Sequence, residues 1–224
     1  MTTQTLNVAR RPSLHEDMSA FFARVEAMFP PDSPWYVDAD YARLAKGTGE
    51  EFSVRSDWRH PEHKMKGSFS VSVREEGFMD DTAQASDRLL YKFPSEMVDA
   101  FNTCQAARTI IESFGAYQVD CYNDNADFEG FNDLVEANYK THKDLNGRDS
   151  VWWLMPLNYW DAEKCRRSFG VSVKKLVARL DPHVYKAEVF EGGAWVQLDE
   201  ELDTHLNRAQ TVDLFTRARV KPTA

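Results

Sequence analysis

The sequence has no long apolar run and few cysteines. No window approaches the ~18 consecutive apolar residues that a membrane-spanning helix needs, and the first residues lack the apolar core of a signal peptide. The three cysteines, Cys104, Cys121 and Cys165, form no CxxC pair, and their odd number leaves at least one thiol unpaired within the chain. We therefore expect no membrane partner, and a cytoplasmic location with reduced, buried thiols.

Signatures of catalysis are missing as well. The chain contains no GxGxxG, P-loop, GxSxG or HExxH motif. Cys104 lies within a predicted helix that has no histidine in the neighbouring turns, so a structural thiol explains it better than a nucleophile. We expect no cofactor and no catalytic residues, which favours a binding protein over an enzyme.

The chain also carries no excess of positive charge. The chain has 27 Lys and Arg against 36 Asp and Glu, a formal net charge of −9. Nucleic acid binding depends on counterion release by basic side chains, so this balance disfavours a direct nucleic-acid partner. A basic protein is the better electrostatic match. The alternative is that the negative charge only keeps the protein in solution.

The apolar periodicity predicts a chain that alternates strands and helices. We expect an α/β (α+β) fold, with a mixed or largely antiparallel sheet packed against several helices. Residues 1–12 are expected to be a loose leader or at most a short strand, 13–222 a single domain, and 32–64 largely irregular. Strands are predicted at 68–73, 88–93, 116–122, 151–154, 184–190 and 194–198, and helices at 14–29, 39–45, 96–114, 128–139, 161–169, 172–180 and 207–217. Ser13, Ser95 and Asp161 are the expected N-caps, and the last two strands are expected to form a hairpin that turns at Gly192-Gly193.

One short segment has the side chains of a metal site. His60, Glu62 and His63, with Asp57 nearby, offer two imidazoles and carboxylates, which are ligands for zinc or iron. Spacing of i, i+3 could place both imidazoles on one helical face, but Pro61 disfavours a helix there. A solvated polar loop is the better-supported interpretation, and a metal-dependent enzyme remains the alternative function.

Carboxylates gather in several predicted loops. Such groups on loops over a rigid scaffold suit docking against a basic surface, although ordinary solvated loops have the same composition. Trp58 and Trp195 are expected to be exposed aromatic contacts, whereas of Trp152 and Trp153 one is expected in the core and the other under a helix or at an interface. The predicted partner-binding residues are Glu75, Glu76, Asp80, Asp81, Asp124, Asp127, Trp195, Asp199, Glu200, Glu201 and Asp203.

Four segments carry a resemblance to a known family. They are Phe93-Pro94-Ser95-Glu96 with a helix ending at Phe114-Gly115, Val151-Trp152-Trp153-Leu154, Arg167-Ser168-Phe169-Gly170, and Gly192-Gly193-Ala194-Trp195-Val196-Gln197 leading to Asp203 and Asn207-Arg208. With the order of the predicted elements over roughly residues 68–222, these segments resemble the type VI immunity family. The chain departs from the family pattern at Val171, where a second glycine is typical, and at Asp203-Thr204-His205, where a Gly-Asp pair is typical.

The resemblance implies inhibition by binding. Members of the family neutralise toxins delivered by type VI secretion, and some accompany nucleases. The expected partner is a cognate toxin domain, basic and plausible as a DNase, whose active site or substrate path the protein would occlude. A structural phage or plasmid protein is the third possibility, and the sequence does not predict the oligomeric state.

Overall fold

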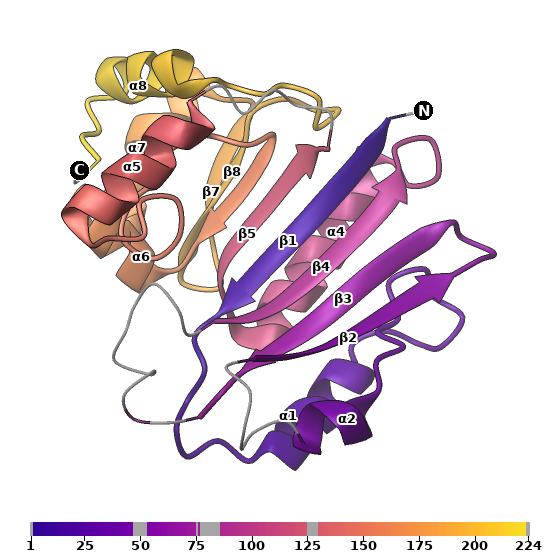
Figure 1. The fold of residues 1–224 in the computed structure, drawn as a ribbon. Helices are drawn as coiled ribbons and strands as arrows, with labels where there is room; N and C mark the ends of the chain where they lie inside the picture. The colour runs from indigo at the N-terminus through magenta and orange to yellow at the C-terminus, as the bar shows by residue number, and fades with distance from the viewer. Residues whose placement is uncertain (1, 47–52, 75, 77–85, 125–129, 223–224) are drawn as a thin grey trace. The chain divides into compact units, whose positions relative to one another are not determined.

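The computed structural model describes residues 2–46, 53–74, 76, 86–124 and 130–222. The chain divides into two compact units, Met1–Ala116 and Tyr117–Ala224, where the sequence predicted one domain over 13–222. Each unit combines antiparallel strands with helices (Figure 1). The predicted α/β (α+β) class, with largely antiparallel pairing and several packed helices, is confirmed.

Four strands form the sheet of the first unit, in the order β2-β3-β4-β1. Each neighbouring pair in this order is antiparallel. The strands are β1 (Thr3–Arg10), β2 (Ser53–His60), β3 (Met65–Ser72) and β4 (Asp87–Pro94).

Two of these strands differ from the sequence prediction. The segment expected to be a loose leader or at most a short strand is an eight-residue strand, β1, which pairs with β4 along its whole length and buries Leu6 and Val8 completely. The stretch expected to be irregular contains β2, which alternates buried and exposed residues. The buried side of β2 includes the polar Ser56 between Val54 and Trp58. The sequence therefore lacks the strict alternation of apolar and polar residues that predicts a strand.

Helices cover one face of this sheet. They are α1 (Met18–Glu26), α2 (Tyr41–Lys46) and α4 (Ala100–Ile110), with α4 continuing into a π-helical turn, Ile111–Gly115. In Figure 1, α4 runs behind β1 and β4. The helices begin later than predicted, because Asp17 and Asp99, rather than Ser13 and Ser95, accept the first backbone N–H groups.

An aromatic cluster forms the core between these helices and the sheet. Phe21 of α1 lies 5.9 Å from Phe69 of β3 and 5.6 Å from Phe114, measured between ring centroids. All three side chains are buried. Edge-to-face and tilted pairs of this kind add to the free energy gained by burying the rings.

The second unit also has four antiparallel strands, in the order β5-β6-β8-β7. The predicted hairpin at Gly192-Gly193 is confirmed, and Gly192 adopts the positive φ (+71°) that such a turn needs. The predicted strand 151–154 is wrong, since only Leu154 makes an isolated bridge and the strand lies a few residues later. The strands are β5 (Ala116–Asn123), β6 (Leu157–Trp160), β7 (Lys186–Phe190) and β8 (Gly193–Gln197).

Four helices lie in the described part of this unit. The side chains of Asp161, Ser172 and Asn207 cap three of them, and of these caps the sequence predicted the one at Asp161. In the described part of the chain, no helix has both the length and the apolar character needed to cross a bilayer. The helices are α5 (Phe131–Thr141), α6 (Ala162–Phe169), α7 (Val173–Leu180), which continues into a 3₁₀ turn (Asp181–His183), and α8 (Arg208–Arg217).

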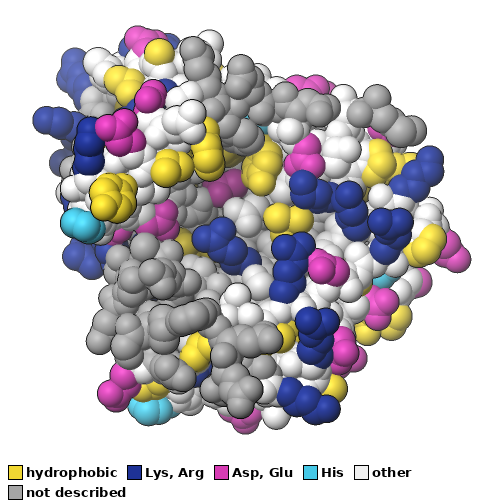
Figure 2. Space-filling model, viewed as in Figure 1, with side chains coloured by type: hydrophobic (Ala, Val, Ile, Leu, Met, Phe, Trp, Pro, Cys, Tyr) yellow, Lys and Arg dark blue, Asp and Glu magenta, His cyan; other side chains and the backbone are white. Residues whose placement is uncertain are grey.

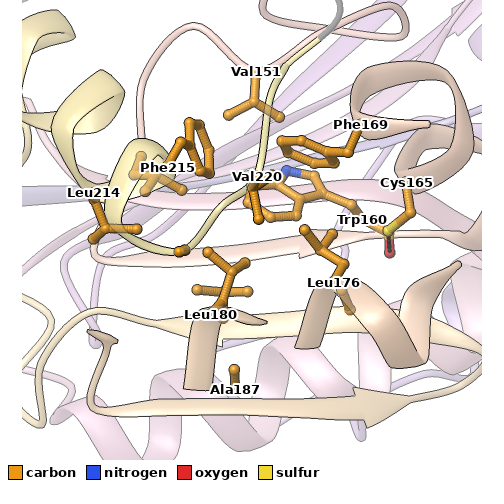
Figure 3. Close-up of a cluster of buried hydrophobic side chains, with 14 of the residues drawn as sticks. Val151, Trp160, Cys165, Phe169, Leu176, Leu180, Ala187, Leu214, Phe215 and Val220 are labelled. Carbon is orange, nitrogen blue, oxygen red and sulfur yellow. Dashed lines mark hydrogen bonds between the residues drawn. The ribbon is translucent and has the colours of Figure 1, made fainter. Parts of the chain in front are cut away.

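Trp160 lies at the centre of the core of this unit (Figure 3). Its ring centroid is 5.4 Å from that of Phe169 of α6, which in turn lies 5.4 Å from Phe215 of α8. Leu176 and Leu180 of α7 close the cluster from another side. The three cysteines, all of which lie in the described residues, form no disulfide; Cys121 and Cys165 are buried, whereas Cys104 is half-buried.

Candidate functional site

The structure separates the predicted acidic residues into three groups. Glu75, Asp80, Asp81 and Asp127 lie outside the described residues. Glu76 is exposed and Asp124 is half-buried. The remaining four form one acidic segment, Asp199 to Asp203, in unit 2.

Asp199 organises this acidic segment. Its carboxylate accepts hydrogen bonds from the backbone N–H groups of Glu201 (2.9 Å), Asp203 (3.1 Å) and Thr204 (2.7 Å). Burial raises the pKa of Asp199, but these hydrogen bonds outweigh it and hold the pKa below its ordinary value. Asp199 therefore shapes the turn, while Glu200, Glu201 and Asp203 are exposed.

The two tryptophans predicted to be exposed are buried, so that prediction is wrong. Trp195 is 0 % exposed within β8 and packs against Phe190, with ring centroids 6.0 Å apart. Trp58 is 6 % exposed and lies over Gly67 of β3, where a Cβ atom would come within 2.3 Å of the indole. Both indoles are core groups, because tertiary packing decides which face of a strand is covered.

The predicted metal ligands lie at a hairpin, not on a helix. His60 ends β2, and its Nε2 lies 2.8 Å from the carbonyl oxygen of Tyr36. Glu62 and His63 follow in the turn to β3. Among the residues that the structure describes, no group of three or more His, Cys, Asp or Glu side chains is placed to hold a metal ion.

His205 follows the acidic segment and holds β5. Its Nε2 accepts a hydrogen bond from the backbone N–H of Asn123 at 3.0 Å, which requires that nitrogen to be unprotonated. Burial lowers the pKa of His205, and the carboxylates of Asp199 and Asp203 oppose the shift.

The lowered pKa of His205 makes stability depend on pH. As the pH falls below about 6.5, the ordinary pKa of histidine, His205 binds a proton more readily in the unfolded chain than in the folded protein. The free energy of unfolding therefore decreases between that pH and the lower pKa of the folded state. We expect urea denaturation between about pH 7.5 and 5 to show a steeper loss in the wild type than in His205→Gln. His15→Gln, at an exposed histidine, is the control and should follow the wild type; equal slopes in all three proteins would contradict this role.

Exposed apolar side chains form a stripe on α5. Phe131 (58 % exposed), Val135 (50 %) and Tyr139 (79 %) follow the i, i+4, i+8 spacing that places them on one helical face. Hydrophobic side chains are visible over α5 in Figure 2. The sequence predicted this helix but not its exposed stripe, for which the i, i+4, i+8 spacing is the signal. We call these three residues the α5 stripe.

Basic side chains form a face on the sheet of unit 1, opposite α1, α2 and α4. Successive side chains of a strand point to opposite faces of the sheet. The residues that alternate with the buried ones in β2, β3 and β4 therefore point away from the helices. Lys and Arg gather over β2, β3 and β4 in Figure 2. The basic face, as we call it, consists of the cationic Arg55, Arg59, Lys66, Arg88 and Lys92.

A mostly apolar hollow of about 540 Å³ lies beside α8. Arg208 lies over the Trp152 ring, 4.1 Å from its centroid, and donates to the Trp152 carbonyl oxygen at 2.9 Å. Trp153 is buried among Leu134 and Met155. Trp153 therefore enters the core, as predicted for one member of the pair, whereas Trp152 is partly buried against the same cluster.

One lysine is fully enclosed. The Nζ of Lys164 donates to Gln118 Oε1 at 2.8 Å, to the Ser150 carbonyl at 3.3 Å and to the Gly147 carbonyl. Burial lowers the pKa of Lys164 to about 8, against the opposing charges of nearby aspartates. These three oxygen atoms accept hydrogen bonds from the ammonium group, so Lys164 joins α6 to the loop before β6.

Comparison with known proteins gives a likeness in fold. No protein-family model matches the chain, and no curated protein matches it in sequence. Among solved structures, a Pseudomonas aeruginosa T6SS (type VI secretion system) protein, PA0821, is similar over 97 % of this chain and 72 % of its own, with a TM-score of 0.53 and 12 % identity. At this identity the likeness shows a shared fold.

Proposed function

We propose that this protein is an immunity protein of a type VI secretion system, which binds a cognate toxic effector and blocks its active site or its path to substrate. Two independent observations favour this function: the family resemblance of the element order, and the likeness in fold to a T6SS protein. Inhibition by binding requires an exposed surface with anchoring side chains rather than a catalytic centre.

The α5 stripe is the observation that carries the proposal. Phe131 and Tyr139 expose aromatic rings to solvent on a regular helix, and aromatic anchors supply much of the binding free energy in protein interfaces. Leu134 is the buried residue of α5, so the other face of the helix holds it to the unit. The occupant we assign to the stripe is the toxin domain of the effector.

Charge complementarity supports a basic toxin as that occupant. The stripe is flanked on α5 by the exposed carboxylate of Asp133 and by Glu136, which forms an ion pair with Lys140 of the same helix. Elsewhere in unit 2, the acidic segment contributes the exposed carboxylates of Glu200, Glu201 and Asp203. A nuclease has a basic surface where it binds phosphates, so this arrangement fits a nuclease effector and speeds its capture.

Removing both rings of the stripe tests the proposal. We expect the double variant Phe131→Ala/Tyr139→Ala to bind the toxin domain encoded by the neighbouring gene at least about 100-fold more weakly than the wild type, because two exposed anchors are lost. Isothermal titration calorimetry at two salt concentrations measures this change, and a fall in affinity with salt is expected from the carboxylates.

Phe101→Ala is the matched control. Phe101 of α4 is an aromatic residue that is 70 % exposed on the other unit, so its removal should leave the affinity unchanged. A toxin that binds the double variant as tightly as the control would remove the α5 stripe from the interface.

A further inference from the structure

The basic face is a charge feature that the proposed function does not use. It carries five cationic side chains, and among the described strand residues of this face Asp57 is the one carboxylate. This local excess occurs in a chain whose net charge is −9. Like charges collected on a folded surface repel one another, so binding of a partner of opposite charge would relieve that repulsion.

The register of the strands arranges the cations in two rows. Arg59 pairs with Lys66, and Lys66 pairs with Lys92, so three cations lie side by side across β2, β3 and β4. Strands are about 4.8 Å apart, so this row is about 10 Å wide. The second row contains Arg55 and Arg88, joined through Ser70.

The two rows are separated by a middle row that consists of Asp57, Ser68 and Leu90. Four residues along a strand, from Arg59 to Arg55, correspond to about 13 Å. Between the rows lies Leu90, which is half-buried, opposite Ser68. A groove of about 570 Å³ follows this surface. Asp57 is engaged by Arg55, whose Nε lies 2.8 Å from its Oδ1.

We propose that the basic face is a docking surface for an acidic segment of a partner protein, distinct from the toxin that the α5 stripe binds. The segment would present carboxylates about 13 Å apart, matching the two rows, on either side of an apolar side chain that covers Leu90. Neither the proposed immunity function nor the α5 stripe is needed for this interaction.

An acidic protein fits this face better than a nucleic acid does. Proteins that bind single strands stack bases on exposed aromatic rings, whereas the aromatic residues of these strands, Trp58, Phe69, Tyr91 and Phe93, are all buried on the opposite side of the sheet. The negative charge of the rest of the chain also opposes a long polyanion.

Charge reversal with a matched control tests the inference. The variant Arg59→Glu/Lys66→Glu removes two of the three cations of the first row, and Lys174→Glu/Lys175→Glu makes the same charge change at exposed lysines of α7. The probes are a fluorescent poly-L-glutamate peptide and an oligothymidylate of equal length, each titrated at about 50 mM salt. Thermal melting is used to check that each variant is folded. If Arg59→Glu/Lys66→Glu does not fold, Arg88→Glu takes its place in the titrations.

We expect the peptide to bind the wild type and the α7 variant equally, and to bind the basic-face variant at least about tenfold more weakly. Amide resonances of β2, β3 and β4 should shift on titration. Equal peptide binding by all three proteins would overturn the inference. So would tighter binding of the oligothymidylate, or self-association that the same substitutions abolish. The affinity of the basic-face variant for the toxin is measured separately, because it tests the proposed function and not this docking surface.

Discussion

Replacing Asp87 with alanine is expected to lower the free energy of unfolding by about 3–5 kcal/mol, because it leaves buried positive charge uncompensated. Asp87 is 0 % exposed at the start of β4. Its carboxylate accepts two hydrogen bonds from Arg74, at 2.8 and 2.7 Å, and one from the backbone N–H of Ser72 at 3.0 Å. Chemical denaturation followed by circular dichroism measures the loss.

The cost is large because two guanidinium groups depend on this carboxylate. Arg10 Nη1 lies 3.2 Å from Asp87 Oδ2, and the Arg10 guanidinium stacks over Phe21 at 3.9 Å. Glu16 is the other carboxylate of the cluster and accepts from Arg10 at 2.6 Å. Without Asp87, one carboxylate would face two arginines that the surrounding core keeps from water.

Asp57→Ala is the control for this prediction. Asp57 also pairs with an arginine, Arg55, but both side chains are mostly exposed, so its removal should cost under about 1 kcal/mol. If Asp87→Ala were no more destabilising than Asp57→Ala, the buried cluster would not hold β1 and β4 as described.

Replacing Trp160 with alanine is the second large expected effect, a loss of about 3–5 kcal/mol. Trp160 is 1 % exposed and lies at the centre of the core of unit 2 (Figure 3). Its ring contacts Phe169, and Cys165 Sγ lies 3.5 Å from its carbonyl oxygen. Alanine would leave a cavity among side chains from α6, α7 and α8 that cannot all move to fill it.

Tyr185→Ala provides the comparison for Trp160. Tyr185 is an aromatic residue of the same unit that is 55 % exposed, so its truncation should change stability by under about 1 kcal/mol. A Trp160→Ala protein with the wild-type denaturation midpoint would show that this cluster is not the core of the unit.

Local signals in the sequence predicted much of unit 2. Asp161, Ser172 and Asn207 cap helices through contacts with residues only three positions away, and Gly192 supplies a turn that few other residues adopt. Such local interactions can be inferred from neighbouring residues alone. The class of fold followed from them.

Long-range packing was not predictable in the same way. β1 is a strand because β4, some eighty residues away, pairs with it, and the Asp87 cluster joins residues from β1, β4 and the end of β3. The expected exposure of Trp58 and Trp195 was wrong for the same reason, since sequence does not show which face of a strand a helix or a second strand covers. Conversely, the spacing of the α5 stripe and the alternation Arg55, Asp57, Arg59 are present in the sequence, but their exposure is seen only in the fold.

The proposed function of this protein is to inhibit a toxin by binding it. Co-purification with the C-terminal domain of the protein encoded by the neighbouring gene, the candidate toxin, followed by an assay of that domain's activity, tests this function most directly. We expect a stable stoichiometric complex in which the toxin is inactive, and a complex at least about 100-fold weaker with the Phe131→Ala/Tyr139→Ala variant. A toxin that stays active and unbound in the presence of the folded wild-type protein would contradict it.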